Sequence, residues 1–118
     1  MISGDTIVAQ ATPFGYSGTA LIRISGPSSA DILTKLTGID VFAPRVSTYS
    51  KIKSKDNNTI DGALVVLYPA PASYTGENVV EISPHGNPSI ITDIIETICS
   101  FGARLAEPGE FTRRAFIN

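Results

Sequence analysis

The sequence predicts an α+β fold, with a mixed sheet of about five strands and two or three helices packed on it. Short segments rich in Val, Ile and Thr, bounded by turn-forming residues, are typical of strands. Two other segments carry apolar residues at helical spacing. The length of 118 residues, 42% of them hydrophobic, matches a single domain.

The chain is expected to start as a hairpin of two strands, residues 5–12 and 18–25, joined by a loop that consists mostly of turn formers. A short helix over about 27–37 is expected next. Ser28 and Asp31 have the spacing of a capping box, and an apolar face follows them up to a glycine.

A second pair of strands is expected over residues 46–55 and 62–68, around a turn at 56–58. Three lysines alternate along the first of these strands and would point to one face: Lys51, Lys53 and Lys55. They fit either a small basic patch or a solvated sheet edge that lysine protects from aggregation, and the second is the commoner arrangement.

The last predicted strands are residues 78–83 and 103–107, with the clearest helix between them. This helix is expected to start at Asn87 and Pro88, a cap residue followed by a proline in the first turn. A stripe of five isoleucines gives it one buried face, and Gly102 stands where a C-terminal glycine cap belongs. An incipient amphipathic turn follows near the end of the chain.

Composition and charge argue against several classes of protein. Nine Lys and Arg against eleven Asp and Glu give a net charge of −2, too negative to indicate nucleic-acid binding by the whole domain. Cys99 is the only cysteine, so no intrachain disulfide is possible and a cytoplasmic protein is expected. Neither a secretory signal nor an apolar run of ~18–20 residues is present, so no membrane association is expected.

Motifs for nucleotide or metal chemistry are missing from the sequence. It contains no GxxxxGK[ST] phosphate loop and no GxGxxG after a strand, and one histidine with one distant cysteine cannot form a zinc site. The spacing supports no nucleophile, histidine and acid set around His85. The chain by itself is therefore expected to have no catalytic residues, no metal and no GTP binding.

Two charged residues stand in predicted strands that are otherwise apolar. Glu81 shares a strand face with Val79, and is either a hook for an amidine-like pair of N–H groups in a ligand or an exposed residue of a one-sided sheet. Arg23, near a strand end, either clamps a carboxylate or pairs structurally with an acidic neighbour. Spacing alone leaves these alternatives open.

The loop 83–88 is a further candidate, because free backbone N–H groups at the start of the next helix can meet an anionic or polar ligand group. His85 in this loop is either a structural residue held by hydrogen bonds, which is the commoner case, or a proton shuttle.

Three stretches together resemble the N-terminal domain of the tRNA uridine-modification GTPases of the MnmE or TrmE family. They are DTIVAQATPFGYSGTALIRISG (5–26), SYTGENVVEISPHGNP (73–88) and GARLAEPGEFTRRAFIN (102–118). This chain departs from many members in its Gly15-Tyr16-Ser17-Gly18 loop and in Asn87, where they have the last glycine of an HGG triplet.

The resemblance implies that this domain is similar to the tetrahydrofolate-binding domain of the glycine-cleavage aminomethyltransferase. It also implies that this domain binds folate and forms a homodimer. Arg23 and Glu81 correspond to the family's folate contacts, and a further lysine would fall just past Asn118. The expected cofactor is a 5-formyl or 5,10-methylene tetrahydrofolate. We expect it in a pocket near the start of the isoleucine-rich helix, with Glu81 accepting hydrogen bonds from the pterin.

The resemblance also implies a parent protein that hydrolyses GTP. With a flavin-dependent partner protein it would modify C5 of the wobble uridine in tRNA, using a one-carbon unit from the folate. Its helical and GTPase domains, with GTP, magnesium and potassium, would lie outside residues 1–118. Two alternatives are an aminomethyltransferase-like enzyme domain that transfers the one-carbon unit itself, and a purely structural dimerisation domain.

Overall fold

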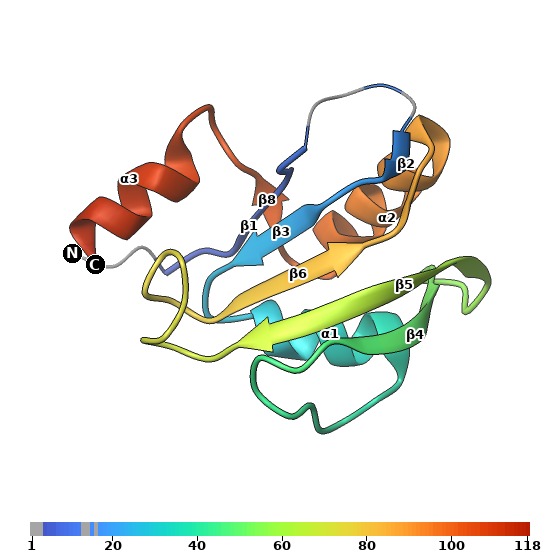
Figure 1. Cartoon of the computed structure of the whole chain (residues 1–118), viewed down its shortest axis with the longest axis horizontal. Helices are drawn as coiled ribbons and strands as arrows, with labels where there is room; N and C mark the ends of the chain where they lie inside the picture. The colour runs from blue at the N-terminus through green and yellow to red at the C-terminus, as the bar shows by residue number, and fades with distance from the viewer. Residues whose placement is uncertain (1–3, 13–14, 16) are drawn as a thin grey trace.

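The computed structural model describes residues 4–12, 15 and 17–118 (Figure 1), so part of the predicted first loop lies outside the described residues. The elements are β1 (Ile7–Gln10), β2 (Ser17–Thr19), β3 (Ile22–Ser25), α1 (Ser29–Thr37), β4 (Thr48–Lys53), β5 (Thr59–Tyr68), β6 (Val79–Ser83), β7 (His85–Gly86), α2 (Pro88–Ser100), β8 (Arg104–Leu105) and α3 (Glu110–Ile117).

Six strands form one mixed sheet in the order β4-β5-β6-β3-β1-β8, and β2 and β7 form a separate two-stranded sheet. Within the large sheet, only the β1–β8 pair is parallel. The predicted α+β class is confirmed. The predicted strand 18–25 is divided between the two sheets, because the Ala20 N–H donates to the carbonyl of Pro84, beyond the end of β6.

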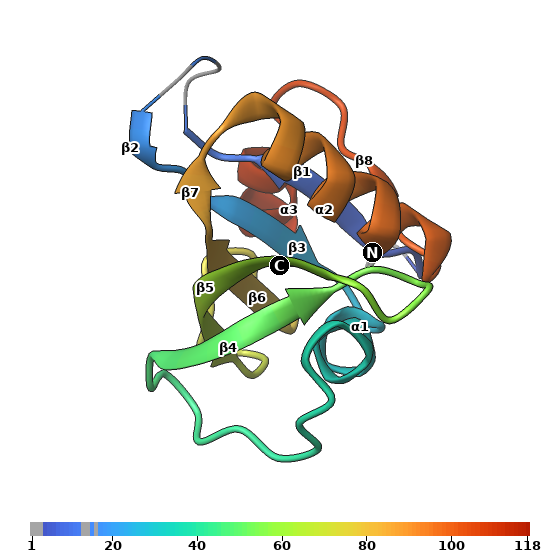
Figure 2. The same cartoon turned by 90° about the vertical axis from the view of Figure 1, so that its right-hand side faces the viewer.

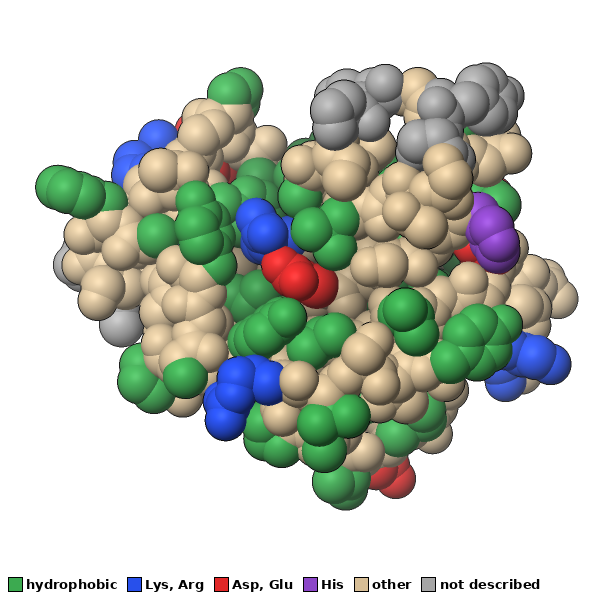
Figure 3. Space-filling model, in the orientation of Figure 1, with side chains coloured by type: hydrophobic (Ala, Val, Ile, Leu, Met, Phe, Trp, Pro, Cys, Tyr) green, Lys and Arg blue, Asp and Glu red, His purple; other side chains and the backbone are tan. Residues whose placement is uncertain are grey.

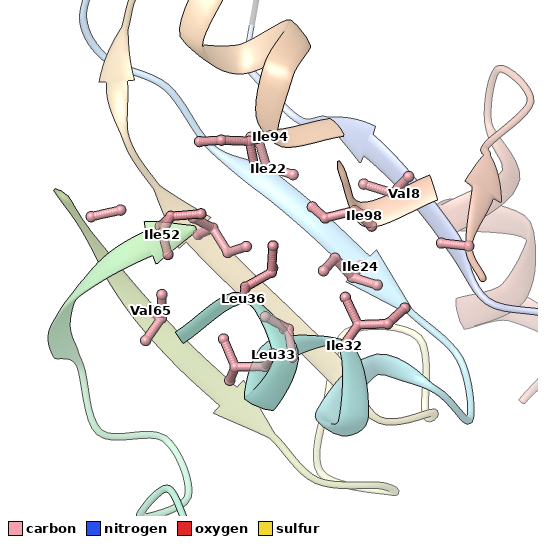
Figure 4. Packing of buried hydrophobic residues seen from close by; sticks show 14 of the residues in the cluster. Val8, Ile22, Ile24, Ile32, Leu33, Leu36, Ile52, Val65, Ile94 and Ile98 are labelled. Carbon is pink, nitrogen blue, oxygen red and sulfur yellow. The ribbon is translucent and has the colours of Figure 1, made fainter. Parts of the chain in front are cut away.

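Helices α1 and α2 cover one face of the large sheet, behind it in Figure 1 and to one side of it in Figure 2. The hydrophobic core lies between these helices and the sheet. Figure 4 shows its main members: Val8, Ile22, Ile24, Ile32, Leu33, Leu36, Ile52, Val65, Ile94 and Ile98. None of the helices in the described part of the chain is both long and apolar enough to cross a membrane.

The other face of the sheet, called the open face below, carries the alternate side chains of the same strands. It is defined by Arg23, Tyr49, Lys51, Leu64, Val66, Glu81 and Ser83. Helix α3 lies at one end of the sheet rather than under it (Figure 1). Side chains on this face are therefore accessible.

Helix α1 begins without the predicted capping box. The Ser28 side chain makes no capping hydrogen bond, because its backbone angles of φ −93° and ψ 3° are not the extended ones that such a cap requires. The Ser28 N–H donates instead to Oγ1 of Thr6, at 2.9 Å. Asp31 forms an i,i+4 ion pair with Lys35.

Helix α2 has both predicted ends. Oδ1 of Asn87 accepts from the Ser89 N–H at 2.9 Å, and Pro88 occupies the first turn. Gly102, with φ +115°, follows the helix and donates its N–H to the carbonyl of Cys99. Asn87 therefore serves as the N-cap of α2.

Strand β4 forms an edge of the large sheet, so its lysines lie where a solvated edge is expected. They do not all share one face. The register shifts between Ile52 and Lys53, and Lys55 lies in the following turn.

Candidate ligand site on the open face

Arg23 and Glu81 lie directly opposite each other on β3 and β6. Nε and Nη2 of Arg23 are 3.0 and 2.9 Å from Oε2 of Glu81. Each side chain is 22% exposed, so the pair is partly buried but can still be reached from solvent. The structure thus brings the two predicted site residues together. Arg23 is paired with an acidic neighbour, which is one of the two alternatives that the sequence left open for it.

The Glu81 carboxylate keeps one oxygen for another donor. Both hydrogen bonds from Arg23 end on Oε2, and no other described residue donates to Oε1. An ionised carboxylate can accept several hydrogen bonds through its two oxygens. Glu81 can therefore accept from a ligand N–H while it remains paired with Arg23.

Two aromatic rings stand beside this ion pair. Cζ of Arg23 lies 4.9 Å from the centre of the Tyr74 ring and 5.9 Å from that of Phe111, both within cation–π range. Tyr74 belongs to the loop between β5 and β6, and Phe111 to α3. We call these two rings the aromatic wall. Figure 3 shows an acidic and a basic side chain together on this face, with hydrophobic side chains around them.

The combination of groups suits a flat heteroaromatic ligand. A carboxylate oxygen is free for N–H donors, and the nearby rings offer apolar surface on which a planar group can pack. Val66 lies beside Glu81 on the next strand and adds an apolar floor.

A partly buried network of ion pairs holds α3 against the sheet, and the sequence did not predict it. It consists of Asp5, Glu77, Arg104, Glu110 and Arg114. Arg114 is only 6% exposed, and its Nη1 lies 3.0 Å from Oε1 of Glu77. Its Nη2 lies 2.6 Å from Asp5 and 3.2 Å from Glu110. The only feature of the sequence that indicates one of these ion pairs is the i,i+4 spacing of Glu110 and Arg114.

Hydroxyl groups complete this network on the sheet side. Oγ of Ser25 donates to Oε1 of Glu77 at 2.8 Å and lies 2.7 Å from Oγ1 of Thr75. All three residues are buried. The buried carboxylate of Glu77 is thus hydrogen-bonded as well as ion-paired, as a buried charge requires.

Acid is expected to weaken the attachment of α3. Hydrogen bonds from Arg104 lower the pKa of Glu110 from 4.5 to about 2, although burial opposes this shift. A lowered folded-state pKa contributes stability that is present above the ordinary pKa of 4.5 and is lost as the pH falls through about 2. The free energy of unfolding, measured by urea titration from neutral pH to about 2, should fall across this range. The same slope in Glu110→Gln would show that another group is responsible.

His85 is held by Asp61. Its Nδ1 lies 3.0 Å from Oδ1 of Asp61, and its backbone N–H donates to Oδ2 at 2.9 Å. Burial raises the pKa of Asp61, but the hydrogen bonds from His85 outweigh it, so this pKa lies below its usual value. His85 is therefore held by hydrogen bonds, as a structural histidine is expected to be.

The start of α2 does not contribute to the site around Glu81. This helix packs on the core face, through residues such as Ile94 and Ile98, whereas Glu81 projects from the open face. The pocket expected near the start of the isoleucine-rich helix is thus separated from Glu81 by the sheet. A hollow of about 510 Å³ does lie beside α2, but neither Arg23 nor Glu81 lines it.

Comparison with known proteins gives a consistent result. The family described as the N-terminus of the GTP-binding protein TrmE matches residues 6–118. A tRNA modification GTPase MnmE of Francisella tularensis subsp. holarctica is 49% identical over 118 residues, which cover 100% of this chain and 26% of that protein. The MnmE proteins of Legionella pneumophila and Halorhodospira halophila are 44% and 43% identical, over 99% and 97% of this chain and 26% and 24% of theirs. The chain thus spans about a quarter of the length of the curated relatives it matches.

Proposed function

The chain belongs to the family of the N-terminus of the GTP-binding protein TrmE, and from this membership we propose that it is the folate-binding, dimer-forming part of a tRNA modification GTPase. Its ligand is a tetrahydrofolate derivative, 5-formyl or 5,10-methylene, that serves as a one-carbon donor. Arg23 and Glu81 are its binding residues.

The arrangement around Glu81 supports this proposal. The pterin ring of a folate carries an amino group and an adjacent ring N–H that present paired donors, and a carboxylate is the acceptor that matches them. Oε1 of Glu81 is available for one of these donors, and Oε2, which Arg23 orients, has a further acceptor site for the other. The aromatic wall gives the planar ring a surface to pack against. The residues present therefore fit the proposed cofactor.

A titration of 5-formyltetrahydrofolate into the protein, followed by calorimetry, tests the proposed ligand. We expect saturable binding with one site per chain. GTP is the control ligand, and we expect no binding of it, because the sequence lacks a phosphate loop. A protein that binds GTP but no folate would contradict the proposal, and a dimer that binds neither would support the purely structural alternative.

The open face also supports the proposed homodimer. Two large apolar side chains on its β4–β5 side are unusually exposed, Tyr49 at 67% and Leu64 at 48%. They are cross-strand neighbours, and the Tyr49 phenol lies over Gly62, where a Cβ would collide with it. An exposed apolar patch of this kind is typical of an interface, and in a twofold dimer the same patch is used by both subunits.

Charged substitution on this patch is expected to disrupt self-association. We expect wild-type protein to sediment as a dimer and Leu64→Glu to shift towards monomer, because the new carboxylate would be buried in the interface without a partner. Val41→Glu is the matched control, since Val41 is 84% exposed but lies in the loop between α1 and β4. A wild-type monomer at high concentration would contradict the proposed dimer, and a Leu64→Glu dimer would place the interface elsewhere.

The relatives' printed name, tRNA modification GTPase, supports a proposal for the activity of the whole protein. We propose that the parent protein is a cytoplasmic GTPase that acts with a flavin-dependent partner at C5 of the wobble uridine of tRNA. Magnesium and potassium would belong to its GTPase domain. Within this protein, the present chain would supply folate and dimer contacts rather than catalytic groups.

A further inference from the structure

Two segments that are distant in the sequence together form the aromatic wall. Tyr74 comes from the loop between β5 and β6, which we call the β5–β6 loop, and Phe111 comes from α3. The sheet itself contributes neither ring. The position of the wall beside Arg23 therefore depends on how this loop and this helix are held together.

Several contacts join the β5–β6 loop to α3. The Tyr74 hydroxyl lies 3.0 Å from Oγ1 of Thr112. Nδ2 of Asn118 donates to the carbonyl of Thr75 at 3.1 Å. Gly76 has φ +81°, and a Cβ built on it would lie 2.9 Å from Cβ of Asn118. The loop is thus packed closely on the C-terminal end of the helix.

The buried part of this junction is the ion pair between Glu77 and Arg114, whose side chains are 5% and 6% exposed. Arg114 is held on its other side by Asp5 and Glu110, so its guanidinium is fixed by three carboxylates. A planar guanidinium with partners on several sides has one orientation. The ion pair therefore fixes where the loop stands relative to α3.

We propose that the Glu77–Arg114 ion pair positions the aromatic wall, so that folate affinity depends on two residues that do not touch the ligand. This inference rests on the proposed function, because it assigns a role to these residues in the same site. No ion pair or hydrogen bond of the described residues joins Glu77 or Arg114 to Arg23 or Glu81. Both are positioning residues, which act through Tyr74 and Phe111.

The test is the affinity of Arg114→Lys for 5-formyltetrahydrofolate. Lysine keeps the charge, but its single ammonium cannot reach Asp5, Glu77 and Glu110 in the same geometry. We expect about a tenfold loss of affinity, as is typical when a residue that orients a ligand-binding group is changed. The Arg23 Nε–H signal in NMR spectra of the ligand-free protein should also shift, because the rings of the wall lie above that group.

Arg113→Lys is the matched control, since Arg113 is the preceding residue of α3 and its side chain is 55% exposed. It should leave both the affinity and the Arg23 signal unchanged. Ile98→Val is a second control, which weakens the core beneath α2 without contact with the wall. It should lower stability while the folded protein binds folate as wild type does.

Each outcome decides the inference. Wild-type affinity and an unshifted Arg23 signal in folded Arg114→Lys would overturn it and leave the proposed function intact. Failure of wild-type protein to bind folate would overturn the proposed function, and the inference with it. If Arg114→Lys does not fold, Glu77→Gln decides, because it removes the charge of the same ion pair while keeping a side chain of similar size. We expect about a threefold loss of affinity from the folded variant, and unchanged affinity would overturn the inference.

Discussion

Replacement of Glu81 by alanine is expected to lower the affinity for 5-formyltetrahydrofolate by about 30- to 1,000-fold. The paired N–H donors of the pterin would then be desolvated without an acceptor, at a cost of about 2–4 kcal/mol. The measurement is a calorimetric titration of wild type and variant under the same conditions. GTP serves as the control ligand, because neither the wild-type protein nor the variant is expected to bind it.

A control for Glu81→Ala must come from the same surface. Ser83 lies two residues further along β6 and also faces the open side, so Ser83→Ala removes a polar group from the same strand face. It should bind folate within about twofold of wild type, as a substitution of an uninvolved surface group does. Urea unfolding of both variants shows whether the unpaired Arg23 has altered the fold. Wild-type affinity in folded Glu81→Ala would return Glu81 to a purely structural role.

The removal of Arg23 should have a smaller effect than the removal of Glu81. Arg23 orients the carboxylate through Oε2, whereas the ligand is proposed to bind through Oε1. A loss of orientation reduces affinity less than the loss of the acceptor itself. This difference in rank between the two substitutions follows from the geometry and was not available from the sequence.

Much of the fold follows from local patterns in the sequence. The isoleucine stripe and the Asn87 cap predict α2, because both depend on residues within a few positions of each other. Alternation along β6 predicts that Glu81 points away from Val80 and Ile82. The capping box at Ser28 failed for a tertiary reason, since Thr6 binds the N–H of Ser28 from a distant part of the chain.

The site could be predicted only in part. The sequence identifies Arg23 and Glu81 as charged residues in apolar strands, but they are 58 positions apart and their register comes from the sheet. The partners of Arg114 are more distant still, since Glu77 and Asp5 lie 37 and 109 positions away. No periodicity links such residues. The placement of α2 and Glu81 on opposite faces likewise needed the sheet topology.

Replacement of Arg114 by methionine is expected to lower the free energy of unfolding by about 3–5 kcal/mol, because it leaves the buried carboxylate of Glu77 without its cation and Glu110 with Arg104 alone. Glu77 and Glu110 are each about 5% exposed, and neither can be rehydrated without movement of α3. Urea titration at neutral pH measures the change. Methionine keeps much of the arginine stem, so the loss reports mainly on the ion pairs.

The neighbouring arginine provides the comparison that separates burial from charge. Arg113 is 55% exposed and lies 3.7 Å from Glu107, which is itself 71% exposed, so Arg113→Met should change the free energy of unfolding by no more than about 0.5 kcal/mol. The two substitutions remove the same charge from adjacent positions of one helix. Equal effects of Arg114→Met and Arg113→Met would mean that the buried ion pairs contribute no more to the free energy of unfolding than the exposed ion pair does. The attachment of α3, and the position of Phe111 beside Arg23, would then depend on the exposed contacts of Tyr74 and Asn118 instead.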